Sequence, residues 1–290
     1  MRITLGHSPD PDDAFMFYAI ASEAVTADGI EFEQILQDIE TLNRRALDEQ
    51  LDVTAVSIHA YAYLSDRYAL LPHGASFGDG YGPMVVSKRP LAPADLAGAR
   101  IAIPGKLTSA YLALQLYLTE SGGGAASSGC EPVVVPFDAI PDRVLSGGAD
   151  AGLLIHEGQL TYARSGLHRV IDLGAWWKEG TGLPLPLGGN AIRRGLGAEI
   201  IGRVARALRQ SIVYGLERRS EALSYAEKFG RGLDRPLADR FVGMYVNDLT
   251  LDYGERGRAA VRLFLERGRG AGLISVEPKI EFAEEAGATG

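Results

Sequence analysis

A histidine at the end of an apolar run is the clearest candidate for acid–base chemistry. His156 directly follows the stretch Ala151-Gly152-Leu153-Leu154-Ile155, which is typical of a buried strand. A neutral imidazole at the carboxyl end of a strand can accept a proton near pH 7, so His156 is the candidate general base. A lone histidine is also commonly a packed or surface residue, and this alternative stays open.

Two hydroxyl residues begin a helical pattern after another apolar strand. Thr108 and Ser109 follow Ile103-Pro104-Gly105-Lys106-Leu107. The backbone N–H groups of a helix start, together with these hydroxyls, predict a corner that binds a carboxylate. Capping of the helix by Thr108 explains the same residues equally well. The segment lacks the Gly-Lys-Thr/Ser ending of a nucleotide P-loop.

The N-terminal segment places a turn and an acidic helix start directly after the first strand. Ser8, Asp10 and Asp13 flank or follow Pro11, which suits the first helical position, and Asp10 suits the N-cap. In open parallel sheets this edge faces the ligand crevice, so we expect these three residues to contact substrate. The alternative is a well-capped structural helix.

Two further segments are candidates for lining the same cleft. Ser57 and His59 follow the third predicted strand, and the glycine-rich segment 78–83 precedes the fourth. The glycines allow a ligand to approach the backbone closely. Trp176 and Trp177 either cover an aromatic ligand or pack in the interior.

Strands that alternate with helices must position these residues. The apolar runs predict strands at 3–6, 30–36, 53–58, 84–88, 101–104, 133–137, 152–155 and 170–173. Helical patterns fall at 39–49, 108–120, 201–212, 221–229, 237–245 and 254–267. This alternation predicts an α/β fold with mainly parallel sheets.

The 290 residues fit roughly two domains. Strand-like crossings near 86–91 and 189–194 predict that residues 89–194 form an inserted small lobe, with 1–88 and 195–290 forming a discontinuous large lobe. The cleft is expected between these lobes. Residues 122–129 are expected to form a surface loop, and the last four residues a tail.

Composition restricts the functional classes. The formal charge of −8 provides no basic surface for nucleic acid, and no apolar run is long enough to span a membrane. The single cysteine, Cys130, cannot form an intramolecular disulfide. No histidines and carboxylates have metal-ligand spacing, so no metal is expected. With no signal-peptide pattern before Ile3, we expect a cytoplasmic protein.

These segments together resemble the 1,4-dihydroxy-6-naphthoate synthases of the futalosine route to menaquinone. The likeness covers Ser8 to Phe15, Val53 to Tyr61, Gly80 to Pro83, Ile103 to Ala110 and Ile155 to Tyr162. The resemblance implies the two-lobed fold of type II periplasmic binding proteins. The usual family opening is Ser-Pro-Cys-Pro-Asn-Asp-Thr-Phe, from which this chain departs at Asp10, Asp12 and Ala14.

The resemblance also implies an activity. It implies a carbon–carbon lyase that converts cyclic dehypoxanthinyl futalosine to 1,4-dihydroxy-6-naphthoate, with His156 as the proton acceptor and the Ser57 and Thr108-Ser109 segments on the substrate. No cofactor is implied. The expected partner is a small-molecule carboxylate substrate, and the chain is expected to be a monomer or homodimer. The alternatives are a non-catalytic solute-binding protein and an enzyme similar to chorismate dehydratase.

Overall fold

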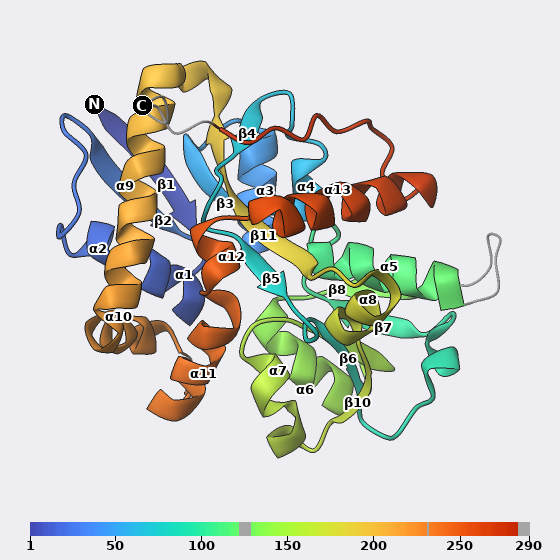
Figure 1. Ribbon diagram of the computed structural model, residues 1–290. Coiled ribbons are helices and arrows are strands. Elements are labelled where there is room, and N and C mark those ends of the chain that lie inside the picture. The colour runs from blue at the N-terminus through green and yellow to red at the C-terminus, as the bar shows by residue number, and fades with distance from the viewer. Residues whose placement is uncertain (122–128, 231, 284–290) are drawn as a thin grey trace. The chain divides into compact units, whose positions relative to one another are not determined.

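The computed structural model describes residues 1–121, 129–230 and 232–283, and the chain forms two compact units (Figure 1). The first unit contains Met1–Phe77, Gly188–Arg258 and the described residues from Pro278 on. The second unit contains Gly78–Leu187 and Ala259–Glu277. Most of the loop expected at 122–129 and all of the expected tail lie outside the described residues.

These boundaries differ from the expected ones at both ends of the inserted segment. The strand at Met84–Ser87, which we assigned to the large lobe, pairs inside the sheet of the second unit. Residues Ala259–Glu277, which were expected in the large lobe, also belong to the second unit.

The sheet of the first unit is mixed. Its strands follow the order β2-β1-β3-β11-β4, and β5 pairs with β11. β1 is parallel to β2 and β3, whereas β11 is antiparallel to β3 and β4. The strands are β1 (Arg2–His7), β2 (Glu31–Leu36), β3 (Val53–Ser57), β4 (Tyr68–Leu70), β5 (Ser76–Gly78) and β11 (Leu185–Arg193).

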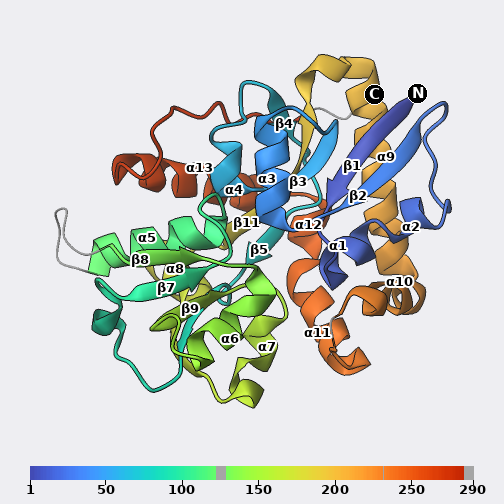
Figure 2. The same cartoon turned by 180° about the vertical axis from the view of Figure 1, so that it is seen from behind.

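Helices cover both faces of this sheet. Figures 1 and 2 show α3 on one face and α9 on the other. Leu42 of α3 packs with Leu51 and Ala55, whereas Leu208 of α9 packs in the larger core around Ile3. The helices are α1 (Pro11–Met16), α2 (Tyr18–Ala21), α3 (Ile39–Leu47), α4 (Ile58–Tyr61), α9 (Ala198–Glu217), α10 (Arg219–Ala226), α11 (Arg235–Tyr245) and α12 (Asp248–Leu251). The last helix, α13 (Gly254–Gly270), begins in the first unit and ends in the second.

The second unit contains a five-stranded mixed sheet. Its order is β10-β6-β9-β7-β8, with β7 parallel to β8 and β9, and β6 antiparallel to β9 and β10. The strands are β6 (Met84–Ser87), β7 (Arg100–Ile103), β8 (Glu131–Val134), β9 (Ala151–Leu154) and β10 (His168–Asp172). The helices are α5 (Ser109–Ser121), α6 (Ile140–Leu145), α7 (Gly158–Thr161) and α8 (Leu173–Thr181), and both tryptophans lie on α8.

The expectation of mainly parallel sheets is therefore wrong. Each sheet combines a parallel set of strands with antiparallel ones. In the first sheet β11 pairs antiparallel with β3, and in the second β6 pairs antiparallel with β9. Hydrophobic pattern alone does not reveal whether a strand pairs in the parallel or the antiparallel direction.

Candidate functional site

In the first unit, the residues expected to bind substrate follow two neighbouring parallel strands. Leu5 of β1 lies opposite Val53 of β3; Ser8 directly follows β1, and Ser57 is the last residue of β3. Because the carboxyl ends of parallel strands meet at one edge of a sheet, Ser8 and Ser57 belong to the same edge. Both side chains are buried.

Asp13 closes the turn that follows β1. Its carboxylate accepts hydrogen bonds from the backbone N–H of Ser8 at 2.7 Å and from the Ser8 hydroxyl at 2.9 Å. Burial raises the pKa of Asp13, while nearby His7 and the bonds from Ser8 oppose that rise. Asp13 therefore holds Ser8 in position at the sheet edge.

Asp10 occupies the N-cap position of α1, as expected, but its side chain makes no capping hydrogen bond. Pro11 begins the helix, as predicted. The neighbouring Asp12 is also buried, and its Oδ1 atom has no hydrogen-bond partner among the described residues. Burial, followed by repulsion from Asp13 and Asp10, raises the pKa of Asp12 well above its usual range. This turn thus concentrates three buried carboxyl groups.

Asn43 is a functional candidate that sequence reasoning missed. It lies on α3, is fully buried, and is bonded twice to Ser57 at the end of β3. The signal in the sequence is an amide on the apolar face of an amphipathic helix, where Ile39, Leu42 and Ala46 set the spacing. His59, two residues after Ser57, is buried on α4 beside Tyr63.

In the second unit, the two remaining groups of candidates again follow neighbouring parallel strands. β7 pairs with β9, and Thr108 follows the first of them while His156 follows the second. Both therefore belong to one edge of this sheet. Sequence spacing alone placed each residue at a strand end, and the strand order brings the two strand ends next to each other.

Thr108 is the N-cap of α5. Its Oγ1 atom accepts from the backbone N–H of Tyr111 at 3.2 Å, and its hydroxyl donates to the carbonyl of Gly105 at 2.9 Å. The hydroxyl of Ser109 donates to the carbonyl of Leu187. Both hydroxyl protons are therefore directed to backbone oxygens, and the Tyr111 N–H in the first turn of α5 is bonded to the capping hydroxyl.

His156 lies in the turn between β9 and α7. Its φ angle of 54° places it in the left-handed region, which is uncommon for a residue other than glycine. The half-buried imidazole meets the ring of Phe137 edge to face, with 4.9 Å between the ring centroids. Backbone conformations of this kind concentrate at functional sites, which favours a functional role for His156.

The glycine-rich segment at 78–83 has a packing role that we did not expect. A Cβ atom on Gly174 would lie 1.9 Å from the carbonyl oxygen of Tyr81, and one on Gly78 would lie 2.1 Å from the same atom. Gly82 also approaches the backbone of Gly174. These glycines therefore allow two stretches of protein backbone to meet. Trp177 nearby is buried and donates its indole N–H to the carbonyl of Pro184.

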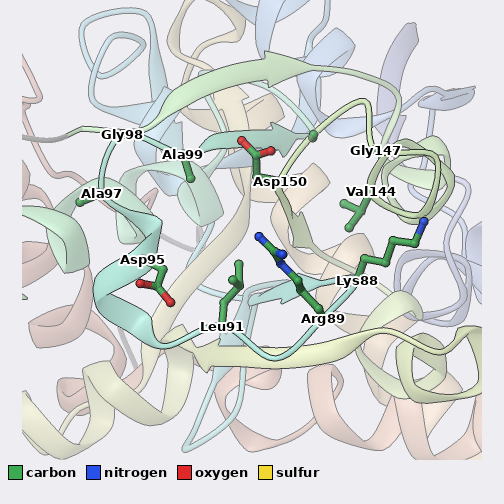
Figure 3. A pocket seen from close by; sticks show the side chains of 11 residues that line it. Lys88, Arg89, Leu91, Asp95, Ala97, Gly98, Ala99, Val144, Gly147 and Asp150 are labelled. Carbon is green, nitrogen blue, oxygen red and sulfur yellow. The ribbon is translucent and has the colours of Figure 1, made fainter.

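A separate pocket of about 920 Å³ lies in the second unit (Figure 3). It contains none of the expected site residues, and its charged groups are largely used internally. Lys88 donates to the carbonyl of Leu145, and Asp150 binds the guanidinium of Arg100, with Arg89 pointing toward Asp150 in Figure 3. The pocket lining includes no histidine, cysteine or hydroxyl side chain, so it is not a candidate for the reaction.

Within the described ranges, no three histidine, cysteine, aspartate or glutamate side chains are grouped so that they could hold a metal ion. In that same part of the chain, no helix has both the length and the apolar character needed to cross a membrane.

The chain belongs to a biosynthetic family. Residues 3–270 match the family described as menaquinone biosynthesis, so this chain is a member of that family. It is 43% identical to the 1,4-dihydroxy-6-naphthoate synthase of Thermus thermophilus over 97% of this chain and 98% of the relative. Identity to the enzyme of the same name from Streptomyces coelicolor is 38%, over 94% of each chain.

Solved structures agree on the architecture. Protein AF1704 from Archaeoglobus fulgidus is 49% identical, with a TM-score of 0.87 and coverage of 94% of this chain and 98% of that chain. The Candida albicans protein CA3427, described as having the generic periplasmic binding protein fold, is 12% identical with a TM-score of 0.66, covering 98% of each chain. The expected α/β fold of the periplasmic-binding-protein type is confirmed.

Proposed function

We propose that this protein is a 1,4-dihydroxy-6-naphthoate synthase, a carbon–carbon lyase that acts on cyclic dehypoxanthinyl futalosine. The observation that carries the proposal is the 43% identity to the Thermus thermophilus enzyme of that name along almost the whole of both chains.

His156 is the base in this proposal. The reaction requires removal of a proton from the substrate, after which a carbon–carbon bond breaks, a small sugar-derived fragment is released and the ring system becomes aromatic. An imidazole is suited to this step near neutral pH. The contact of the His156 ring with Phe137 supports the assignment because it restrains the ring, and the left-handed backbone conformation is of a kind that concentrates at functional sites.

The remaining candidates bind the substrate. The corner at the start of α5, formed by Thr108 and Ser109, binds the substrate carboxylate in the second unit. In the first unit, Ser57 and His59 contact polar groups of the substrate, as do Ser8, Asp10 and Asp13. The turn bonds between Ser8 and Asp13 support this role because they preorganise the sheet edge.

The test is incubation of the purified protein with cyclic dehypoxanthinyl futalosine while formation of the naphthoate is followed by absorbance. Conversion is expected without any added metal or redox cofactor. Tight binding of the compound with no conversion would instead identify a non-catalytic binding protein. Turnover of chorismate in place of the cyclic compound would instead identify an enzyme similar to chorismate dehydratase.

A further inference from the structure

The amide of Asn43 is fully buried in the middle of α3, a position where asparagine is unfavourable. Asparagine has lower helix propensity than the leucine or alanine residues that share this face, and a buried amide must satisfy its hydrogen bonds within the protein. Both bonds recorded for the side chain go to one residue, Ser57, which lies fourteen positions away at the end of β3.

The pair of hydrogen bonds has a fixed direction. The backbone N–H of Ser57 donates to Oδ1 of Asn43 at 2.9 Å, which identifies that atom as the carbonyl oxygen. The other end of the amide is therefore the NH₂ group, and it donates to the Ser57 Oγ atom at 3.1 Å. Since the Ser57 hydroxyl accepts this bond, its own proton must point away from Asn43.

We propose that Asn43 is a positioning residue that makes Ser57 a hydrogen-bond donor to the substrate. The proposal rests on the proposed function, in which Ser57 contacts substrate. The amide holds Oγ by donating to it, and the Ser57 proton is left for an oxygen atom of the substrate. The position of Ser57 at a strand end, on the same sheet edge as Ser8, supports this direction.

A purely structural role for Asn43 is the alternative, because the same two bonds tie α3 to β3. The two roles differ in what an exchange of amide for carboxylate does. In Asn43→Asp the introduced carboxylate still accepts from the Ser57 N–H, so the tie is kept. It also accepts from the Ser57 hydroxyl, however, and so turns the serine proton away from the substrate.

The experiment measures KM and kcat for conversion of cyclic dehypoxanthinyl futalosine in Asn43→Asp, Ser57→Ala and the double variant. We expect each single variant to raise KM by about 10- to 100-fold, the effect of losing one hydrogen bond to a polar or charged group. The double variant should resemble Ser57→Ala, because Asn43 acts through Ser57. Asn43→Leu, of similar size, replaces Asn43→Asp if the carboxylate prevents folding.

A pH profile adds a readout that a structural tie would not give. When the introduced carboxyl is protonated it can donate to Ser57 again, so KM of Asn43→Asp should fall toward the wild-type value as pH is lowered. Asn190→Asp is the matched control, since Asn190 is equally buried in the same unit but bonds the carbonyl of Gly74. That variant should lower the melting temperature and leave KM unchanged.

Three results would overturn the inference. The first is a normal KM in folded Asn43→Asp, and the second is a normal KM in Ser57→Ala. The third is additivity in the double variant, which would mean that Asn43 contacts the substrate itself. A wild-type protein that converts none of the compound would instead overturn the proposed function, and the inference would fall with it.

Discussion

His73 makes the stability of the first unit sensitive to acid. It lies in the connection between β4 and β5 and is fully buried. Burial, with a smaller contribution from Arg209 on α9, lowers the pKa of His73 from 6.5 to about 4, while the backbone of Ala205 and the carboxylate of Asp252 oppose the shift. The folded protein therefore holds this imidazole in its neutral form.

The magnitude follows from proton linkage. Between pH 6.5 and pH 4 the unfolded chain binds a proton at His73 that the folded chain does not bind, so the free energy of unfolding decreases as pH falls. Each pH unit in this window costs about 1.4 kcal/mol. The loss is thus about 2 kcal/mol at pH 5 and about 3 kcal/mol at pH 4, and above pH 6.5 it is absent.

The assay is urea unfolding at a series of pH values from 4 to 8, for the wild type, His73→Leu and the control His168→Gln. His168 lies exposed on β10. We expect His73→Leu to flatten the dependence of unfolding free energy on pH below 6.5, whatever the difference in unfolding free energy between the variant and the wild type at pH 8. The control should keep the wild-type slope. An unchanged slope in His73→Leu would refute the reasoning.

Three other predictions concern the site and its support. His156→Asn should reduce turnover by roughly a hundredfold or more with an unchanged melting temperature, measured by absorbance and calorimetry; a lower melting temperature with normal turnover would make His156 a scaffold residue. Asp12→Asn should be more stable than the wild type by an amount that grows as pH rises above 4, because burial raises the pKa of Asp12 and ionising it opposes folding. Equal melting temperatures of the variant and the wild type at pH 8 would contradict this. Gly174→Ala should lower the free energy of unfolding by about 1–3 kcal/mol, because the new Cβ would meet the carbonyl of Tyr81. Gly180→Ala on the same helix, where a Cβ meets nothing within 4 Å, should raise that free energy by up to about 1 kcal/mol. Denaturant unfolding measures both.

Much of the fold was predictable because its strands are short apolar runs with polar residues at their ends. All eight predicted strands correspond to observed ones, although the run at 133–137 is displaced from β8. The sequence did not reveal β4 or β5, which have only three residues each, and it indicated β11 only as a strand-like crossing at 189–194. Short buried strands of this kind contain too few residues for an alternation of apolar and polar side chains to be recognised.

The chemistry of individual site residues was harder to predict than their location. Thr108 was equally consistent with capping and with binding, and the structure establishes the cap through its bond to Tyr111. Asp10 suited the N-cap by residue type, yet its side chain makes no capping bond. Asn43 was missed because its partner, Ser57, is distant in sequence and only the packing of α3 on β3 unites them.

The departure of this chain from the usual family opening has a physical explanation at Asp12. The family opening has an asparagine there, which is neutral, planar and able both to donate and to accept hydrogen bonds. Burial and the neighbouring Asp13 and Asp10 raise the pKa of Asp12, so this carboxyl keeps its proton to higher pH than an exposed aspartate. A protonated carboxyl has the same shape as the amide, with one O–H donor and a carbonyl acceptor. When protonated, the aspartate therefore preserves more of the local hydrogen-bonding chemistry than the change of residue type suggests, and burial together with the neighbouring Asp13 and Asp10 favours that protonated form.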